Sequence, residues 1–369
     1  MVKNEKINSH QFLTLVTLFT IGTTILIIPG GLAVEAKQDA WIVSLVGTGI
    51  GVFVIWIFNT LVRNFPNMTI VQINEQLFGK WLGKTVSLFF VSMPLLYTSI
   101  LLIYNGSFLN THMMPNTPAL ALNLLMILIL VMGVRLGLET IARSAEIFIP
   151  IFFILFIILV IFLIPQIKFE NIQPVFEVET KTILRASLHL ITTSSVNSVI
   201  LLMIFPALIN QPKEARKSFY IGNIIGGVVI IIITILSILV LGAETTARHT
   251  YPSFILARKI NVGDFIQRIE GTIAIMWFIT IYFKMALYFY ASVLGITQIL
   301  NLKYYRPLVL PLAMIVGVLS IIMYEDVVKQ QNFDATVTIA YSLSVGLFLP
   351  LIMLIVSIFR RKGKTEQRE

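Results

Sequence analysis

The sequence contains no cysteine and few charged residues, and each shortage excludes a class of protein. With a cysteine count of 0, it offers neither a disulfide framework nor a thiolate metal site. Charged residues make up 12% of the chain, whereas soluble domains carry roughly 25%. So few charges cannot cover the surface of a water-soluble globule. The composition therefore excludes a soluble enzyme, a disordered chain and a fibrous protein.

Long apolar stretches are abundant instead, since 57% of the 369 residues are hydrophobic. Ten stretches have the length that crosses a bilayer as a helix, about 20 residues. They cover residues 10–35, 40–62, 84–108, 117–135, 144–164, 183–209, 218–241, 268–297, 307–324 and 336–359. The remainder is too short for an extramembrane domain, so residues 1–369 are predicted to form a single all-α membrane domain in the lipid bilayer. A net charge of +9 then requires no nucleic-acid partner, because basic residues of membrane proteins collect in cytoplasmic loops.

The distribution of Lys and Arg predicts the orientation of this multi-pass protein. These residues are more numerous in the segments that share a side with the two ends of the chain, which places both termini in the cytoplasm. Residues 65–83 mix aromatic and aliphatic side chains with polar ones, which is typical of a cytoplasmic interfacial helix. Residues 360–369 are rich in Lys and Arg and are predicted to form a basic cytoplasmic tail.

The first stretch contains a weak point near the middle of the bilayer. Gly22, Thr23 and Thr24 follow one another there, before Ile25 and Pro29. An unwound turn in lipid costs several kcal/mol for each unsatisfied backbone group. A break at this point would therefore face a cavity or a ligand. The alternative is a small-residue site that packs against a neighbouring helix.

The sixth stretch carries a run of polar residues at the same depth. Between Thr192 and Ser198 only Val196 is apolar, and the run includes Ser194, Ser195 and Asn197. Ser and Thr can hydrogen-bond back to their own helix, but so many polar side chains together with Asn indicate a binding or pathway role.

These two irregular stretches occupy matching places if the ten spans divide into halves of five, at residues 10–164 and 183–359. Interrupted segments at corresponding positions indicate a transporter-type binding site. The free N–H groups at the start of a half-helix suit an anionic group such as an amino-acid carboxylate.

Lys284 is a cation within the eighth stretch, and it is predicted to face the bundle interior. It shares one helical stripe with Trp277. No Asp or Glu lies at similar depth in any predicted span, so its partner is a backbone carbonyl, a bound carboxylate or nothing. The alternative, in which the side chain reaches the inner interface, demands more length than one side chain has. Tyr97, in the third stretch, could cover a ligand, although helix packing and an outer aromatic belt explain it equally well.

Enzymatic motifs are not found in the sequence. The four histidines are scattered, with no carboxylate or second histidine at metal-ligand spacing, and there is no phosphate-binding Gly-rich loop or nucleophile elbow. We therefore expect no catalytic residue, no metal, no cofactor and no enzyme.

Several local motifs resemble those of a known family. The segment from Ile21 to Pro29 resembles the first-helix break of the amino acid–polyamine–organocation transporter superfamily, with Thr24 in place of a second glycine. Within that superfamily, the chain resembles the B subunit of spore germinant receptors. The stretches that carry this likeness are Gln38–Trp41, Phe65-Pro66 with Gly79–Lys84, Gly137–Arg143 with Glu146 and Pro150, and Asn171–Pro174.

The resemblance implies a LeuT-like fold of ten transmembrane helices in a 5+5 inverted repeat with broken helices 1 and 6. It also implies a place in the spore inner membrane, in a receptor with an A subunit and a lipoprotein C subunit. The B subunit would hold an amino acid or similar small nutrient where a transporter holds its substrate. The expected ligand-binding residues are Gly22, Thr23, Thr24, Ile25, Tyr97, Thr192, Ser194, Ser195, Asn197 and Trp277.

Lys284 would then take the place of the cation that sodium-coupled relatives hold between helices 1 and 8. Two alternatives to a receptor subunit share these residues. One is a secondary amino acid transporter coupled to protons or ions, and the other is a structural or channel-forming subunit.

Overall fold

A computed structural model describes residues 5–262, 266–267, 270–324 and 326–366 of the chain. The first five predicted spans appear as α1 (Ser9–Ile21) with α2 (Thr24–Ala36), α3 (Ala40–Arg63), α5 (Lys80–Phe108), α6 (Ala119–Leu136) and α7 (Leu138–Leu163). The next three appear as α8 (Thr180–Ile191) with η6 (Thr192–Val196) and η7 (Asn197–Met203), then α9 (Pro212–Leu241), then α12 (Glu270–Ile299). The last two are α13 (Arg306–Ile322) and the run of α15 (Val337–Leu343), η8 (Ser344–Phe348) and α16 (Leu349–Glu366).

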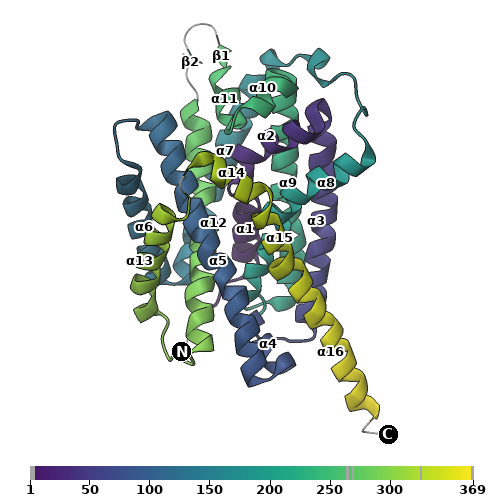
Figure 1. The fold of residues 1–369 in the computed structure, drawn as a ribbon, viewed down its shortest axis with the longest axis vertical. Helices are drawn as coiled ribbons and strands as arrows, with labels where there is room; N and C mark the ends of the chain where they lie inside the picture. Colours follow the sequence, from purple (N-terminus) through teal and green to yellow (C-terminus); the bar gives the residue numbers. More distant parts are fainter. Residues whose placement is uncertain (1–4, 263–265, 268–269, 325, 367–369) are drawn as a thin grey trace.

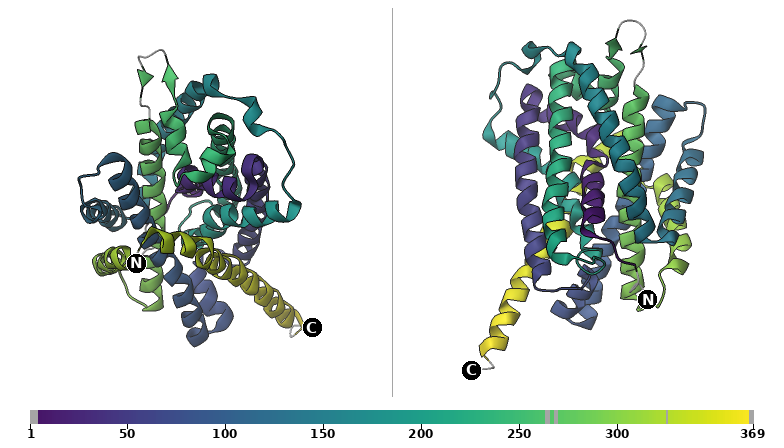
Figure 2. Two further views of the ribbon diagram at one scale, coloured as in Figure 1. Left: turned by 45° about the horizontal axis from the view of Figure 1, so that its top comes forward. Right: turned by 180° about the vertical axis from the view of Figure 1, so that it is seen from behind.

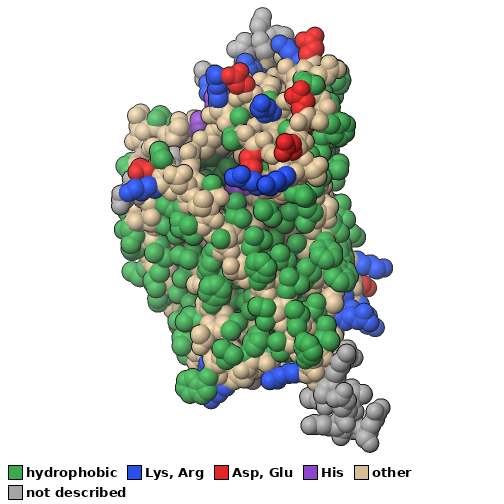
Figure 3. All heavy atoms as spheres, turned by 45° about the vertical axis from the view of Figure 1, so that its right-hand side comes forward, with side chains coloured by type: hydrophobic (Ala, Val, Ile, Leu, Met, Phe, Trp, Pro, Cys, Tyr) green, Lys and Arg blue, Asp and Glu red, His purple; other side chains and the backbone are tan. Residues whose placement is uncertain are grey.

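Eight helical runs among the described residues are long and apolar enough to cross a membrane, and α1 and α13 are shorter apolar helices. The chain is thus a multi-pass membrane protein. Figure 3 shows apolar side chains over the middle of one face, with Lys, Arg, Asp and Glu gathered toward its two ends. Exposed large apolar side chains are frequent on α6, α7 and α13, as expected for helices that face lipid.

Both termini lie at one end of the bundle, and the opposite end is called the far end below (Figure 1). The central helix α1 is buried along almost its whole length and packs against α9, α12 and α7. Helices α6 and α13 lie together on one flank, while α3 and α8 lie on the other (Figures 1 and 2). Close approach of α1 to α9 needs Gly226, since a Cβ there would lie 2.6 Å from the Thr20 Cβ.

Short elements fill the connections. The predicted interfacial helix 65–83 is only nine residues long in α4 (Ile70–Phe78). A capping box of Thr69 and Gln72 starts α4, and Gly79, at φ 81°, ends it before α5 begins. Toward the far end lie α10 (Ala243–Arg248), α11 (Pro252–Arg258), α14 (Val327–Ala335) and the paired strands β1 (Asn261–Val262) and β2 (Ile266–Gln267). The remaining short turns are η2 (Lys37–Asp39), η3 (Leu109–Met113), η4 (Ile164–Gln166) and η5 (Phe169–Ile172).

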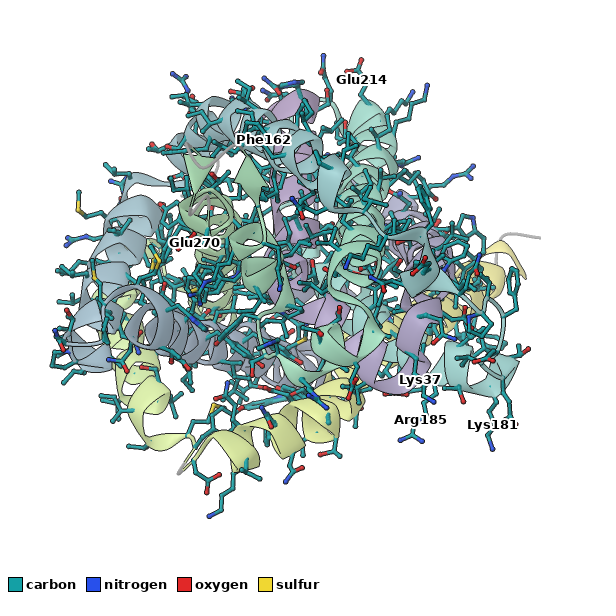
Figure 4. All side chains as sticks on the ribbon, turned by 90° about the horizontal axis from the view of Figure 1, so that it is seen from above. Lys37, Phe162, Lys181, Arg185, Glu214 and Glu270 are labelled. Atoms are coloured by element: carbon teal, nitrogen blue, oxygen red, sulfur yellow. The ribbon has the colours of Figure 1, made fainter. Side chains whose placement is uncertain are left out.

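The rim of the far end is charged. Viewed from above, Lys37, Lys181 and Arg185 point outward on one side of the bundle (Figure 4). The Arg185 guanidinium lies 3.8 Å from the Glu35 carboxylate. Arg185 therefore belongs to the surface, although it falls within the predicted sixth span. Of the predicted tail 360–369, the backbone stays helical in α16 as far as Glu366, and residues 367–369 lie outside the described part of the chain.

Candidate functional site

The first helix is interrupted at Gly22, as the sequence predicts. Helix α1 ends at Ile21, Gly22 adopts φ 33° and ψ −123°, and α2 begins at Thr24. The Gly22 N–H donates to the Leu18 carbonyl at 2.9 Å, and its carbonyl accepts from the Thr280 hydroxyl at 2.9 Å. Protein groups therefore satisfy Gly22 itself. Helix α2 starts without a side-chain cap, so the first N–H groups of α2 are the ones that could receive a ligand.

Lys284 crosses this break from α12. A Cβ at position 22 would lie 2.3 Å from the Lys284 Cδ and 2.9 Å from the Phe19 carbonyl oxygen, so only glycine leaves room for the lysine. The Lys284 ammonium donates to the Thr193 carbonyl at 2.8 Å and lies 5.0 Å from the centre of the Phe19 ring. A backbone carbonyl was one of the partners expected for this cation. Lys284 thus joins α12 to the interrupted first helix and to the sixth.

The sixth helix changes type at the predicted polar run. Regular α geometry ends at Ile191, a π-helical turn covers Thr192–Val196, and a 3₁₀ segment covers Asn197–Met203. A π-turn inserts one extra residue per turn and often marks a functional site. The departure from α geometry, rather than a fully extended turn, presents the Thr193 carbonyl to Lys284.

Hydroxyl groups of this run mostly bond within their own helix. The hydroxyls of Thr192, Thr193 and Ser194 each donate to a carbonyl four residues earlier, at 2.7 Å. Hydrogen bonding of Ser and Thr back to their own helix therefore explains the presence of these three hydroxyls. Asn197 differs, because its side-chain oxygen is buried and has no hydrogen-bond partner among the described residues.

A cavity of about 60 Å³ lies between the first, sixth and eighth helices, α5 and the last helical run. The residues that line it include Thr23, Thr24, Tyr97, Tyr104, His189, Thr192, Thr193, Asn197, Lys284, Tyr288, Asp334 and Thr338. The Tyr288 hydroxyl, like the Asn197 oxygen, is buried without a hydrogen-bond partner in the described chain. At about 15 Å³ per water, the cavity has room for a few waters or a very small ligand. The Asn197 oxygen and the Tyr288 hydroxyl are therefore free to bind a polar ligand in this cavity.

The cavity collects six of the predicted site residues. Thr23, Thr24, Tyr97, Thr192, Asn197 and Lys284 all line it. Tyr97 forms a wall, because its hydroxyl bonds the Ser342 hydroxyl at 2.5 Å and the Thr338 carbonyl at 3.1 Å. Its ring stacks on Tyr288 at 5.6 Å between centroids.

The other predicted residues lie around the cavity rather than on its lining: Gly22, Ile25, Ser194, Ser195 and Trp277. The Ile25 carbonyl accepts a hydrogen bond from Ser253 at 2.6 Å. The Ser195 hydroxyl donates to the Asn223 side chain of α9 at 2.9 Å, on the side where α3 packs against the sixth helix. The Trp277 ring packs against Phe108 at 4.6 Å.

Ser195 is therefore expected to serve packing rather than ligand binding. Replacing Ser195 with alanine leaves the buried Asn223 oxygen without its donor, which costs about 1–2 kcal/mol. We expect Ser195→Ala to lower the thermal midpoint of the purified protein and to leave the half-saturating concentration of any stabilising compound unchanged. Weaker binding in this variant, at an unchanged midpoint, would place Ser195 in the binding site instead.

Sequence reasoning missed several lining residues, and Asp334 is the most consequential. It precedes the predicted last span, 336–359, by two residues, so it lies outside every predicted span. In the fold, α14 leads into the last helical run, so that Asp334 reaches the top of the cavity. An acid immediately before an apolar span is the signal that could have indicated it.

A second and larger cavity, the vestibule, lies on the far-end side of the first. It measures about 760 Å³, and its lining combines apolar residues with polar and charged ones, among them Glu35, His112, Arg248, His249 and Gln330. Figure 3 shows a hollow near the far end of the molecule with histidine at its edge. Tyr104 and Asp334 line both cavities, and the Tyr104 hydroxyl donates to the Asp334 carboxylate. This contact lies where the vestibule and the inner cavity meet.

Comparison with solved structures identifies the fold of this protein. The fold matches that of MhsT, solved in complex with L-phenylalanine, with a TM-score of 0.66 and 15% identity over 96% of this chain and 99% of that chain. It also matches Mhp1, a nucleobase-cation-symport-1 family transporter with bromovinylhydantoin bound, with a TM-score of 0.68 and 12% identity over 95% of this chain and 78% of that chain. The protein is thus a membrane protein with the LeuT-type transporter fold.

The sequence comparisons then show the family. The profile described as "Spore germination protein" matches residues 6–333, so the chain belongs to the spore germination protein family. Spore germination protein KB of Bacillus subtilis is 26% identical over 100% of this chain and 98% of its own length. Spore germination protein YndE of the same organism is 24% identical over 98% of each chain. The chain is accordingly a permease-type membrane protein and not an enzyme.

Proposed function

We propose that this chain is the nutrient-binding subunit of a spore germinant receptor and senses an amino acid or similar small nutrient in the inner cavity. The observation that carries the proposal is a small cavity beside the break in helix 1, lined by Asn197 and Tyr288, whose buried side-chain oxygens form no hydrogen bond within the described residues. Unsatisfied buried groups are costly, and a polar ligand would satisfy them. The vestibule supplies the route of entry from the far end.

A carboxylate on the nutrient would bind at the start of α2, where Thr24 and Ile25 contribute N–H groups of the first helical turn. A helix N-terminus favours negative charge. Lys284 would hold helices 1, 6 and 8 together in the position that a coupling cation occupies in sodium-coupled relatives. Ligand binding can signal only if it favours one arrangement of these helices over another.

We propose that the protein lies in the spore inner membrane with both termini in the cytoplasm. The names of the relatives, which are spore germination proteins, support the first part, and the distribution of Lys and Arg supports the second. The partners proposed for the complex are a germinant receptor A subunit and a lipoprotein C subunit.

A secondary amino acid transporter of the same superfamily is the second candidate function. The match to MhsT and Mhp1 over nearly the whole chain favours it. Uptake of a labelled amino acid by the chain in liposomes would support transport, whereas ligand-dependent stabilisation without uptake would support sensing.

Thermal unfolding of the purified chain with a panel of the common L-amino acids, simple sugars and nucleosides tests the proposal. We expect at least one compound to stabilise the protein, by about 2.7 kcal/mol at about 100 times its Kd. Stabilisation by none of them, with an ion leak through liposomes containing the protein, would contradict a nutrient-binding role and support a channel.

Asn197→Ala separates binding from folding in this assay. The Asn197 oxygen forms no hydrogen bond within the described residues, but its side chain also interacts with the Tyr97 and Tyr288 hydroxyls. Its removal is therefore expected to lower the thermal midpoint by no more than Ser195→Ala does. Loss of one hydrogen bond to the ligand should raise the half-saturating concentration about 10-fold. Ser195→Ala, two residues earlier in the same helical run, is the matched control. An equal half-saturating concentration in wild type and Asn197→Ala would remove Asn197 from the site.

A further inference from the structure

Asp334 lies at the top of the inner cavity, where the sequence indicated no charge. We propose that its carboxylate binds the ammonium group of an amino-acid ligand, in exchange for the hydrogen bond that it now receives from Tyr104. The inference rests on the proposed nutrient-binding function and specifies the ligand class: an α-amino acid with a free amino group.

The surroundings of Asp334 leave its charge uncompensated. It is the one acidic residue on the cavity lining in the described part of the chain. Its hydrogen-bond partners are two neutral hydroxyls, that of Tyr104 and that of Thr338 at 3.5 Å. Among described residues, no Lys, Arg or His nitrogen lies within 4.0 Å of its carboxylate. A half-buried carboxylate at membrane depth is costly without a cationic partner, and a ligand ammonium would supply one.

The opposite charge lies on the same cavity. The Lys284 side chain lines the cavity beside the break in helix 1 and bonds the Thr193 carbonyl. The start of α2, with its N–H groups, borders the same region through Thr23 and Thr24. The space thus offers positive charge at the helix-1 break and a carboxylate from α14. An α-amino acid carries the complementary pair of charges, whereas a sugar or nucleoside would leave both protein charges unpaired.

Binding at Asp334 would also open the contact between the two cavities. Tyr104 on α5 and Asp334 on α14 line both the inner cavity and the vestibule. An ammonium group on the carboxylate would compete with the Tyr104 hydroxyl and loosen the link between α5 and α14. The ligand would therefore differ in affinity between the linked and the unlinked arrangement, which a signalling ligand requires.

The test compares wild type, Asp334→Asn and Tyr104→Phe by thermal unfolding with each common L-amino acid. Asparagine keeps the size of the side chain and removes the charge, while Tyr104→Phe removes the competing hydroxyl and keeps the carboxylate. For an amino acid that stabilises wild type, we expect Asp334→Asn to raise the half-saturating concentration by about 10- to 100-fold. Tyr104→Phe should bind it equally well or more tightly.

A comparison on the ligand side keeps the proposal testable even if Asp334→Asn does not fold. Each amino acid that stabilises wild type is compared with its N-acetyl and desamino forms, which carry no ammonium group. Loss of stabilisation with both analogues supports the assignment, and equal stabilisation by either analogue overturns it. Equal binding to wild type and folded Asp334→Asn also overturns it.

The same panel distinguishes failure of this assignment from failure of the proposed function. If a sugar or nucleoside stabilises wild type and no amino acid does, the nutrient-binding function stands and the role of Asp334 falls. If no compound stabilises the protein, both fall.

Discussion

Gly22→Ala is expected to abolish ligand-dependent stabilisation and to lower the stability of the protein by about 2–4 kcal/mol. Position 22 has φ 33°, a conformation that side chains with a Cβ rarely adopt. The added methyl would also lie 2.3 Å from the Lys284 Cδ and 2.9 Å from the Phe19 carbonyl oxygen. Lys284 would have to leave the break, and its bond to Thr193 would be lost. Thermal unfolding with and without the stabilising compound measures both effects.

Gly49→Ala is the matched control for this change. Gly49 lies within the transmembrane helix α3, and a Cβ there meets nothing within 4 Å. We expect wild-type stability and wild-type ligand response from Gly49→Ala. If Gly22→Ala behaved like the control, neither the helix break nor the position of Lys284 across it would be needed for stability or ligand binding.

Lys284→Met is expected to raise the half-saturating ligand concentration on the order of 100-fold while the protein still folds. Methionine has similar length and no charge, and replacement of a buried charge by an apolar side chain is often neutral for stability. The Thr193 carbonyl, however, loses the donor that holds it at 2.8 Å, which costs about 1–3 kcal/mol. The interrupted helix 1 and the π-turn of helix 6 would no longer be joined through α12. Lys284→Gln, which keeps a donor, should lie between wild type and Lys284→Met.

Lys84→Met tests whether any loss of a lysine–carbonyl bond has this effect. The Lys84 ammonium donates to the Ile299 carbonyl at 2.6 Å, and neither residue lines a cavity described above. Its replacement should leave the dose curve unchanged. Equal curves for wild type and Lys284→Met, at equal protein levels, would remove Lys284 from the mechanism.

The membrane spans could be predicted closely from hydropathy. Each of the ten apolar stretches corresponds to a helical run in the fold, because a backbone in lipid must satisfy its own hydrogen bonds and can do so locally as a helix. Less regular connections were harder to predict. Helix α4 is shorter than expected because Gly79, at φ 81°, ends it, and the sequence around it does not show which of its glycines takes that role.

The candidate site could be predicted only in part. Gly22 could be predicted because glycine weakens a helix in mid-membrane, and Lys284 because a charge is costly there. The fold brings the two residues into contact. The polar run from Thr192 to Ser198 was predicted as a group, but its side chains point to different sides of the helix. Thr192 and Asn197 face the cavity, whereas Ser195 bonds Asn223 on α9. A helix with mixed π and 3₁₀ turns does not keep the regular spacing from which faces are inferred.

Local composition was thus enough to establish a multi-pass helical protein and the two places where its helices are interrupted, because lipid penalises every unsatisfied polar group wherever it occurs. The three-dimensional packing established which charges share a space. Lys284 and Asp334 lie on one small cavity, although they come from different helices and Asp334 lies outside every predicted span. Their proximity depends on how distant helices cross, and neither hydropathy nor residue spacing contains that information.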